Sequence, residues 1–305
     1  MINESAVDDK TGRKFYLASP EPLGEDDQLT FILNLHGGGS FGAWQRLYFP
    51  AQDYVDRYRL VVASPTAATA EPMRRWIAEA DDEHLKNVVE IVFQRFGLDR
   101  IASFWLAGHS QGGMTSIRLL QTDYFADRVD GWLSLSGGRL GRAQVVDNFG
   151  PPLQPGQERR WPTPDGRRPA FTPPPLPDTD LSFIFATGEH EIKALPETSP
   201  WAEKYGAGPR RRLDDVVDTE PGQTYDKERE GRSSKSWGLL PRPGVAEVYV
   251  YPDARGGFVV ADVLRRDKGH TEGLEPKITE ELIKMIVSAP GGKARVLAGR
   301  SASTP

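Results

Sequence analysis

The sequence of 305 residues contains no cysteine and no long apolar run. The lack of cysteine excludes disulfide bonds, thiolate catalysis and cysteine-ligated zinc. It favours a cytoplasmic location, with a secreted protein free of disulfides as the alternative. The first residues also lack the basic start and apolar core of a signal peptide. Because no apolar run approaches the length of a membrane span, we expect no membrane partner.

The chain also has no excess of positive charge. Lysine and arginine number 38 against 43 aspartates and glutamates, which gives a formal net charge of −5. Because binding to nucleic acid needs a cationic surface for the phosphates, the charge argues against nucleic acid as the main partner. A composition of 38% hydrophobic and 27% charged residues instead fits a globular protein with long polar segments.

Short apolar runs alternate with helical patterns along most of the chain. Strands are predicted at 30–35, 60–65, 104–107, 131–136, 181–186 and 258–264, and helices at about 79–96, at about 111–120 and around Ile278, Leu282 and Met285. This alternation predicts an α/β fold with a mostly parallel, doubly wound sheet and helices on both faces.

Two polar segments interrupt the alternation, at about 140–178 and about 195–243. Long inserts between sheet strands often form a lid or a pocket wall over one end of the sheet, and a mobile surface excursion is the alternative. We expect a single domain over 1–289, with both inserts inside it. The tail over 290–305 is predicted to be disordered.

The most informative motif is G-H-S-Q-G at 108–112, directly after an apolar run and before a helical segment. A strand that runs into G-x-S-x-G and then into a helix is the layout of a nucleophile elbow. The serine, here Ser110, then lies on a sharp turn with its hydroxyl exposed above a parallel sheet. The flanking glycines are needed because the turn leaves no room for side chains.

A serine hydroxyl needs a neighbouring base that a third group orients. His270 is the best candidate among five histidines, because it follows the last strand and completes the chain order serine, acid, histidine. The acid should follow the preceding strand, where Glu191 is the first choice and Glu189 the alternative; Asp267 is a weaker third candidate. Either glutamate would hold the imidazole in the tautomer that accepts the serine proton. Taken singly, each of these residues could also be a solvated loop residue.

An oxyanion hole needs fixed N–H donors. We expect them from the backbone of Gln111 and from Gly38 or Gly39 in the glycine-rich loop after the first predicted strand. This loop lacks the Lys-Ser/Thr ending of a P-loop, and the chain has no H-E-x-x-H, so we expect no cofactor and no metal. Three side chains near these loops could line an acyl or alcohol pocket, or could pack the rim of the sheet: Phe41, Trp44 and His109.

With these motifs the chain resembles the α/β-hydrolase superfamily over most of residues 14–288. The stretches L-H-G-G-G at 35–39 and G-H-S-Q-G-G-M-T at 108–115 are similar to motifs of its polyhydroxybutyrate-depolymerase and feruloyl-esterase-like branch. The resemblance implies the α/β-hydrolase fold and hydrolysis of carboxylic esters, including aryl esters and polyesters, without a cofactor. The chain departs from that branch in lacking a signal peptide and cysteines, in using glutamate for the usual aspartate, and in its two inserts.

We therefore expect a serine esterase in which Ser110 attacks the ester carbonyl, His270 takes its proton and Glu191 orients the imidazole. A peptidase, amidase or lactonase of the same fold is the nearest alternative. A non-catalytic hydrolase fold that binds a ligand is the alternative from another class. The expected partner is a small or polymeric ester, and the sequence leaves the oligomeric state open.

Overall fold

One mixed sheet organises the chain. The computed structural model describes residues 1–71, 73–140, 145–147, 149–150, 174–223, 234–238 and 241–302. In these ranges an 11-stranded sheet has the order β1-β2-β4-β3-β5-β6-β7-β11-β10-β8, and β9 also pairs with β10. The strands are β1 (Ile2–Asp8), β2 (Arg13–Ser19), β3 (Leu29–Leu35), β4 (Leu60–Pro65), β5 (Ile101–His109), β6 (Gly131–Leu135), β7 (Ser182–Gly188), β8 (Arg211–Arg212), β9 (Val216–Val217), β10 (Val245–Val250) and β11 (Val260–Arg266).

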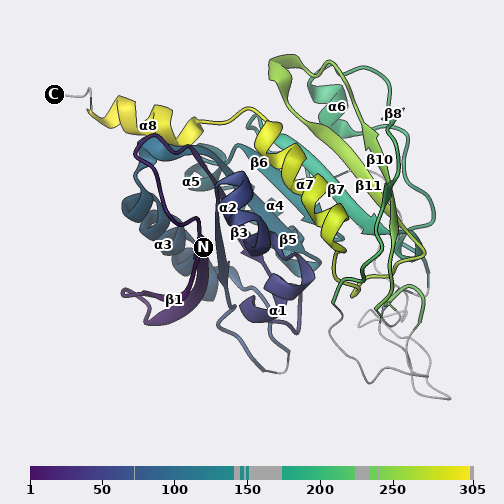
Figure 1. Ribbon diagram of the computed structural model, residues 1–305, viewed down its shortest axis with the longest axis horizontal. Helices are drawn as coiled ribbons and strands as arrows, with labels where there is room; N and C mark the ends of the chain where they lie inside the picture. The colour runs from purple at the N-terminus through teal and green to yellow at the C-terminus, as the bar shows by residue number, and fades with distance from the viewer. Residues whose placement is uncertain are drawn as a thin grey trace.

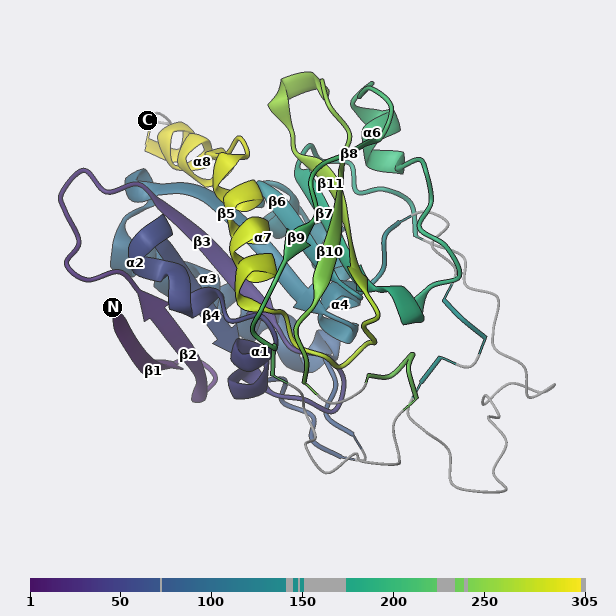
Figure 2. The same ribbon diagram turned by 45° about the vertical axis from the view of Figure 1, so that its right-hand side comes forward.

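The central strands of this sheet are parallel, from β4 through β3, β5, β6 and β7 to β11. Every residue of β3, β4, β6 and β7 is buried. Continuous burial is expected for parallel strands, because helices cover both of their faces. Antiparallel pairs extend the sheet at both ends, through β1 and β2 on one side and β10 on the other (Figure 2).

Helices cover both faces of the sheet, as the sequence predicts (Figure 1). One apolar core contains buried residues of α3 (Ala78–Phe96), α4 (Gln111–Leu120), α5 (Asp123–Ala126) and α6 (Pro200–Lys204). The core on the opposite face contains buried residues of α1 (Gly42–Tyr48), α2 (Val55–Tyr58) and α7 (Pro276–Ser288). Short 3-10 turns occur at Ala51–Tyr54, Leu98–Arg100, Glu189–Glu191 and Arg255–Gly257. No helix in the described residues is both long and apolar enough to cross a membrane.

The two predicted inserts differ in how much of them the structure describes. In the second, α6 packs into the core through Trp201, which stacks on Phe183 of β7 at a ring-centroid distance of 5.6 Å. The strands β8 and β9 of the same insert pair with β10 and so extend the sheet. Most of the first insert lies outside the described residues. The prediction that this part forms a lid therefore concerns residues that the structure does not describe.

The prediction of a disordered tail is wrong for residues 293–302, which form α8 (Lys293–Ala302). Ala294 is buried in the core. The ammonium of Lys293 donates to the carbonyl of Val129 at 2.8 Å and to the hydroxyl of Thr179 at 2.7 Å, and burial lowers its pKa to about 8. Only a few residues of the tail make these contacts. Its overall polar composition therefore does not indicate that it is ordered.

Asp130 joins this tail to the sheet, since its carboxylate accepts hydrogen bonds from the backbone N–H of Phe104 at 2.9 Å and of Lys293 at 3.1 Å. Asp130→Ala leaves these amides without their acceptor, so we expect the free energy of unfolding to fall by about 2 kcal/mol. Urea denaturation measures this loss. Asp127→Ala, at an exposed position nearby, should stay within about 0.5 kcal/mol of the parent. Equal losses of unfolding free energy in the two variants would contradict the role of Asp130 in joining the tail to the sheet.

Candidate active site

Ser110 lies on a sharp turn between β5 and α4. Its backbone has φ 52° and ψ −116°, a conformation that costs energy for a residue with a side chain. The turn is held by close packing, because a methyl group on Gly108 would overlap the backbone of Gly112, and one on Gly112 would overlap the carbonyl of Leu35. The G-x-S-x-G motif therefore forms the strand-turn-helix elbow that its sequence predicts.

Three side chains that are far apart in the sequence meet at this turn. Ser110 Oγ lies 2.8 Å from His270 Nε2, and His270 Nδ1 lies 2.6 Å from Glu191 Oε2. His270 and Glu191 are 3% and 2% exposed, whereas Ser110 is half-buried. The hydroxyl of Ser110 is thus the more accessible group, and the His270 and Glu191 side chains that follow it are buried.

Glu191 is fixed by more than the histidine. Its Oε1 accepts hydrogen bonds from the backbone N–H of Gly188 and from the hydroxyl of Ser136, both at 2.7 Å. Burial by itself raises the pKa of Glu191, but the charge and hydrogen bond of His270 and these two further donors outweigh it, so the pKa lies below its usual value. Sequence reasoning missed Ser136, whose position directly after the strand β6 is the one signal that could have suggested it.

The other two candidate acids turn away from His270. Glu189 Oε2 accepts from the backbone N–H of Asp267 at 2.8 Å, and Glu189 Oε1 pairs with Arg266 at 2.9 Å. Asp267 Oδ1 lies 2.7 Å from His190 Nε2, and its side chain is 61% exposed. Of the three carboxylates considered, the structure brings Glu191 to the histidine.

Gln111 and the glycine-rich loop supply the backbone N–H groups that the sequence predicts for an oxyanion hole. Gln111 is the first residue of α4, so its N–H has no partner within the helix. The N–H of Gly39 donates to the carbonyl of Arg74 at 2.7 Å and is therefore committed. No hydrogen bond within the described residues engages the N–H of Gly38, and a methyl group on Gly38 would lie 3.6 Å from Gln111 Oε1. Gly38 thus lies beside Gln111 with its N–H free.

Residues 66–71 and 73–77 of the loop before α3 support this glycine segment through hydrogen bonds. His36 accepts a hydrogen bond on Nε2 from the N–H of Ala67 at 3.0 Å, and its carbonyl accepts one from the indole N–H of Trp76 at 2.8 Å. Burial lowers the pKa of His36 to about 4, which keeps the imidazole neutral and able to accept. In addition, Gln111 Oε1 accepts from the N–H of Trp76 at 3.2 Å. His36 is consequently a structural residue.

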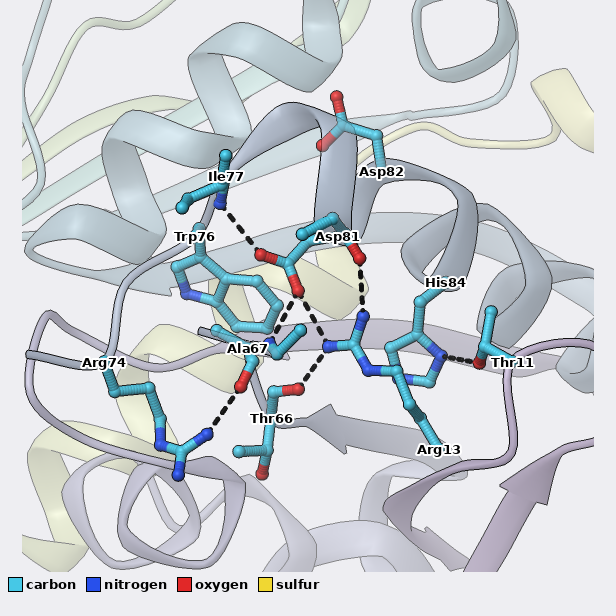
Figure 3. A network of polar contacts seen from close by, with 12 residues as sticks. Thr11, Arg13, Thr66, Ala67, Arg74, Trp76, Ile77, Asp81, Asp82 and His84 are labelled. Atoms are coloured by element: carbon cyan, nitrogen blue, oxygen red, sulfur yellow. Dashed lines mark hydrogen bonds and ion pairs between the residues drawn. The ribbon is translucent and has the colours of Figure 1, made fainter. Parts of the chain in front are cut away.

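Asp81 in α3 holds both ends of that loop (Figure 3). Its fully buried carboxylate accepts from the backbone N–H groups of Ala68 and Ile77 and from the guanidinium of Arg13, each at 2.8 Å. Arg13 in turn donates to the carbonyl of Thr66 at 2.5 Å. Figure 3 also shows that the neighbouring Asp82 points away from this network.

The predicted pocket residues have different environments. Phe41 is 39% exposed, and its ring lies edge-on to Trp44 with centroids 6.2 Å apart. His109 is 2% exposed, stacks on Tyr48 at 3.8 Å and has its Nε2 2.9 Å from the carbonyl oxygen of His270. Burial holds the pKa of His109 well below its usual value. The expectation that His109 lines a pocket is therefore wrong: its buried ring packs behind His270.

Two aromatic residues of the inserts also lie beside His270, and sequence reasoning missed one of them, Phe149. The ring centroids of Phe149 and Trp237 lie 4.9 and 5.0 Å from that of His270. Within the described residues, no group of three or more His, Cys, Asp and Glu side chains is arranged to hold a metal ion. The arrangement can instead perform acyl transfer, because an oriented imidazole can take the serine proton while nearby N–H groups stabilise an oxyanion.

No family model matches the sequence, and no curated protein matches it. Among solved structures, the acetyl xylan esterase from Aspergillus awamori is 12% identical with a TM-score of 0.51, covering 95% of this chain and 100% of that one. Thermogutta terrifontis esterase 2 is 15% identical with a TM-score of 0.38, over 61% of this chain and 70% of that one. FphF of Staphylococcus aureus, a serine hydrolase, is 21% identical with a TM-score of 0.35, over 45% and 56%. The likeness to the acetyl xylan esterase, together with the sheet order, shows that this chain has the α/β-hydrolase fold.

The Asp81 network predicts a difference between two adjacent carboxylates. Asp81→Asn replaces a buried acceptor of three hydrogen bonds, so we expect the free energy of unfolding to fall by about 3 kcal/mol. Asp82→Asn loses a partly exposed ion pair with Arg118, which should cost less than about 1 kcal/mol. Denaturant titration of both variants measures this difference, and similar losses would show that Asp81 does not hold the loop.

Proposed function

We propose that this protein is a serine hydrolase that cleaves a carboxylic ester, with Ser110 as nucleophile, His270 as general base and Glu191 as the acid that orients it. The observation that carries the proposal is the pair of hydrogen bonds from Ser110 Oγ to His270 Nε2 and from His270 Nδ1 to Glu191 Oε2. A serine hydroxyl with such partners is activated for attack on a carbonyl carbon.

The reaction then follows from the positions of these groups. Ser110 attacks the ester carbonyl as His270 takes its proton, and the N–H groups of Gln111 and Gly38 stabilise the oxyanion. His270 returns the proton to the leaving alcohol, which leaves an acyl group on Ser110. Water that His270 activates then releases the acid. Glu191 stays ionised throughout, which agrees with its lowered pKa.

The choice of an ester as substrate is supported by two further observations. The motifs around Gly38 and Ser110 resemble those of ester-cleaving α/β-hydrolases, and the solved structure with the TM-score of 0.51 is an acetyl xylan esterase. The first resemblance extends to aryl esters and polyesters, so we include both in the proposed range.

The nucleophile is tested by Ser110→Ala. This variant should lower kcat for an ester by several orders of magnitude, because no acyl-enzyme can form. Its circular dichroism spectrum and melting temperature should stay close to the parent. Hydrolysis of p-nitrophenyl acetate gives the rate, and near-normal turnover would contradict the proposal.

The acid is tested by comparing two neighbouring glutamates. Glu191→Gln should lower kcat by about 10³-fold or more, because the amide no longer holds the imidazole in the reactive tautomer or stabilises its charged form. Glu189→Gln, whose carboxylate instead pairs with Arg266, should change kcat by less than about 3-fold. Steady-state kinetics on one ester measures both. Equal effects in the two variants would remove Glu191 from the proposed role.

A further inference from the structure

Three aromatic rings surround the imidazole of His270. His109 packs on it from the interior, with ring centroids 4.8 Å apart, and is itself buried. Phe149 lies edge-on to the imidazole and Trp237 lies more nearly parallel to it, and both of these rings are half-buried. Phe149 and Trp237 also contact each other, with centroids 5.8 Å apart. Together they form a partly exposed aromatic surface beside the histidine.

The backbone ties Trp237 to the segment that carries His270. The N–H of His270 donates to the carbonyl of Ser236 at 3.0 Å, and the N–H of Thr271 donates to the carbonyl of Trp237 at 2.8 Å. The hydroxyl of Thr271 donates to the same carbonyl at 2.8 Å. These bonds hold the backbone of Trp237 beside His270, and the indole and imidazole centroids lie 5.0 Å apart.

Phe149 is tied in the same way to the segment that carries Glu191. The N–H of Val146 donates to the carbonyl of Glu191 at 2.9 Å, and the N–H of Phe149 donates to the carbonyl of Val146 at 3.1 Å. Val145 and Ile192 form an antiparallel bridge beside these bonds. Each insert thus pairs with the segment that carries either Glu191 or His270, and each places one aromatic ring beside the imidazole of His270.

The mechanism of ester cleavage indicates which part of the substrate would contact this aromatic surface. When the tetrahedral intermediate collapses, His270 Nε2 must give its proton to the oxygen of the leaving alcohol. That oxygen then lies within hydrogen-bond reach of the imidazole, so the carbon group attached to it extends along the surface around His270. The former carbonyl oxygen points instead to the N–H groups of Gln111 and Gly38.

We propose that Phe149 and Trp237 form a leaving-group subsite that binds an alcohol carrying a flat aromatic ring. The inference rests on the proposed ester hydrolysis and specifies which half of the ester is aromatic. Two aromatic rings in edge contact offer apolar area and ring edges, which favour a third ring in a stacked or edge-to-face position. They offer little to a small aliphatic alcohol.

The test uses a series of esters that share one acid and differ in the alcohol: ethyl, cyclohexylmethyl and benzyl acetate, or the same alcohols with the acyl group that the wild type hydrolyses fastest. The acyl-enzyme is then identical, so differences in kcat/KM report acylation alone. The wild type should prefer the benzyl ester to both others. Trp237→Ala and Phe149→Ala should each lower kcat/KM for the benzyl ester about 10-fold, with the ethyl ester within about 2-fold.

Two further variants control for general effects. Trp237→Phe keeps an aromatic ring and should recover part of the benzyl preference. Phe258 lies just before β11, at the opposite end of that strand from His270, and its half-buried ring stacks on Tyr205. Phe258→Ala should therefore leave the preference for the benzyl ester intact.

Three results would overturn the subsite. An equal loss for all three alcohols in Trp237→Ala and Phe149→Ala would mean that the rings position His270. Unchanged kinetics in both variants would mean that the alcohol lies elsewhere. Equal rates for benzyl and cyclohexylmethyl esters in the wild type would remove the specificity for a flat ring. A wild type that hydrolyses none of a broad ester panel would instead refute the proposed function, and the subsite with it.

Discussion

The close packing of glycine backbone around Ser110 is the constraint on which the site depends. Gly112 packs on the carbonyl of Leu35 at the end of β3, and Gly113 packs on Gly137 just after β6. The first contact sets the distance from the elbow to the loop that carries Gly38. The second sets its distance to Ser136, which donates to Glu191. One tight turn therefore fixes the positions of Gly38 and of Glu191 relative to Ser110 together.

The histidine side has its own rigid support. Arg265 is fully buried and donates to the carbonyls of Glu272 and Gly273, both at 2.7 Å. Lys268 pairs with the buried carboxylate of Glu275 at 2.7 Å. Buried charges are costly unless they are paired and hydrogen-bonded, so this network ties the loop around His270 to one arrangement. The same loop bonds to the segment that carries Trp237, which makes the insert an extension of the site.

Patterns that depend on one segment were readable from the sequence, and those that depend on distant contacts were not. The apolar runs predict β3 and β4, and helical periodicity predicts α3 and α4, nearly to their observed bounds. The strand β1 was missed because its residues alternate between exposed and half-buried positions and pack weakly. The sequence ranked Glu191 over Glu189 by strand position, but the 3-10 turn Glu189–Glu191 decides which of them points inward. The positions of Phe149 and Trp237 beside His270 depend on backbone pairing with segments far along the chain, which the composition of the polar inserts does not reveal.

In the proposed mechanism, His270 and Glu191 activate Ser110 as a nucleophile. The most direct measurement is the mass of the peptide containing Ser110 after the folded protein has reacted with a fluorophosphonate probe, which modifies activated serines. We expect one probe per molecule, attached to Ser110, and loss of this adduct in His270→Ala and after denaturation. No adduct on Ser110, or an equal yield in His270→Ala, would contradict it.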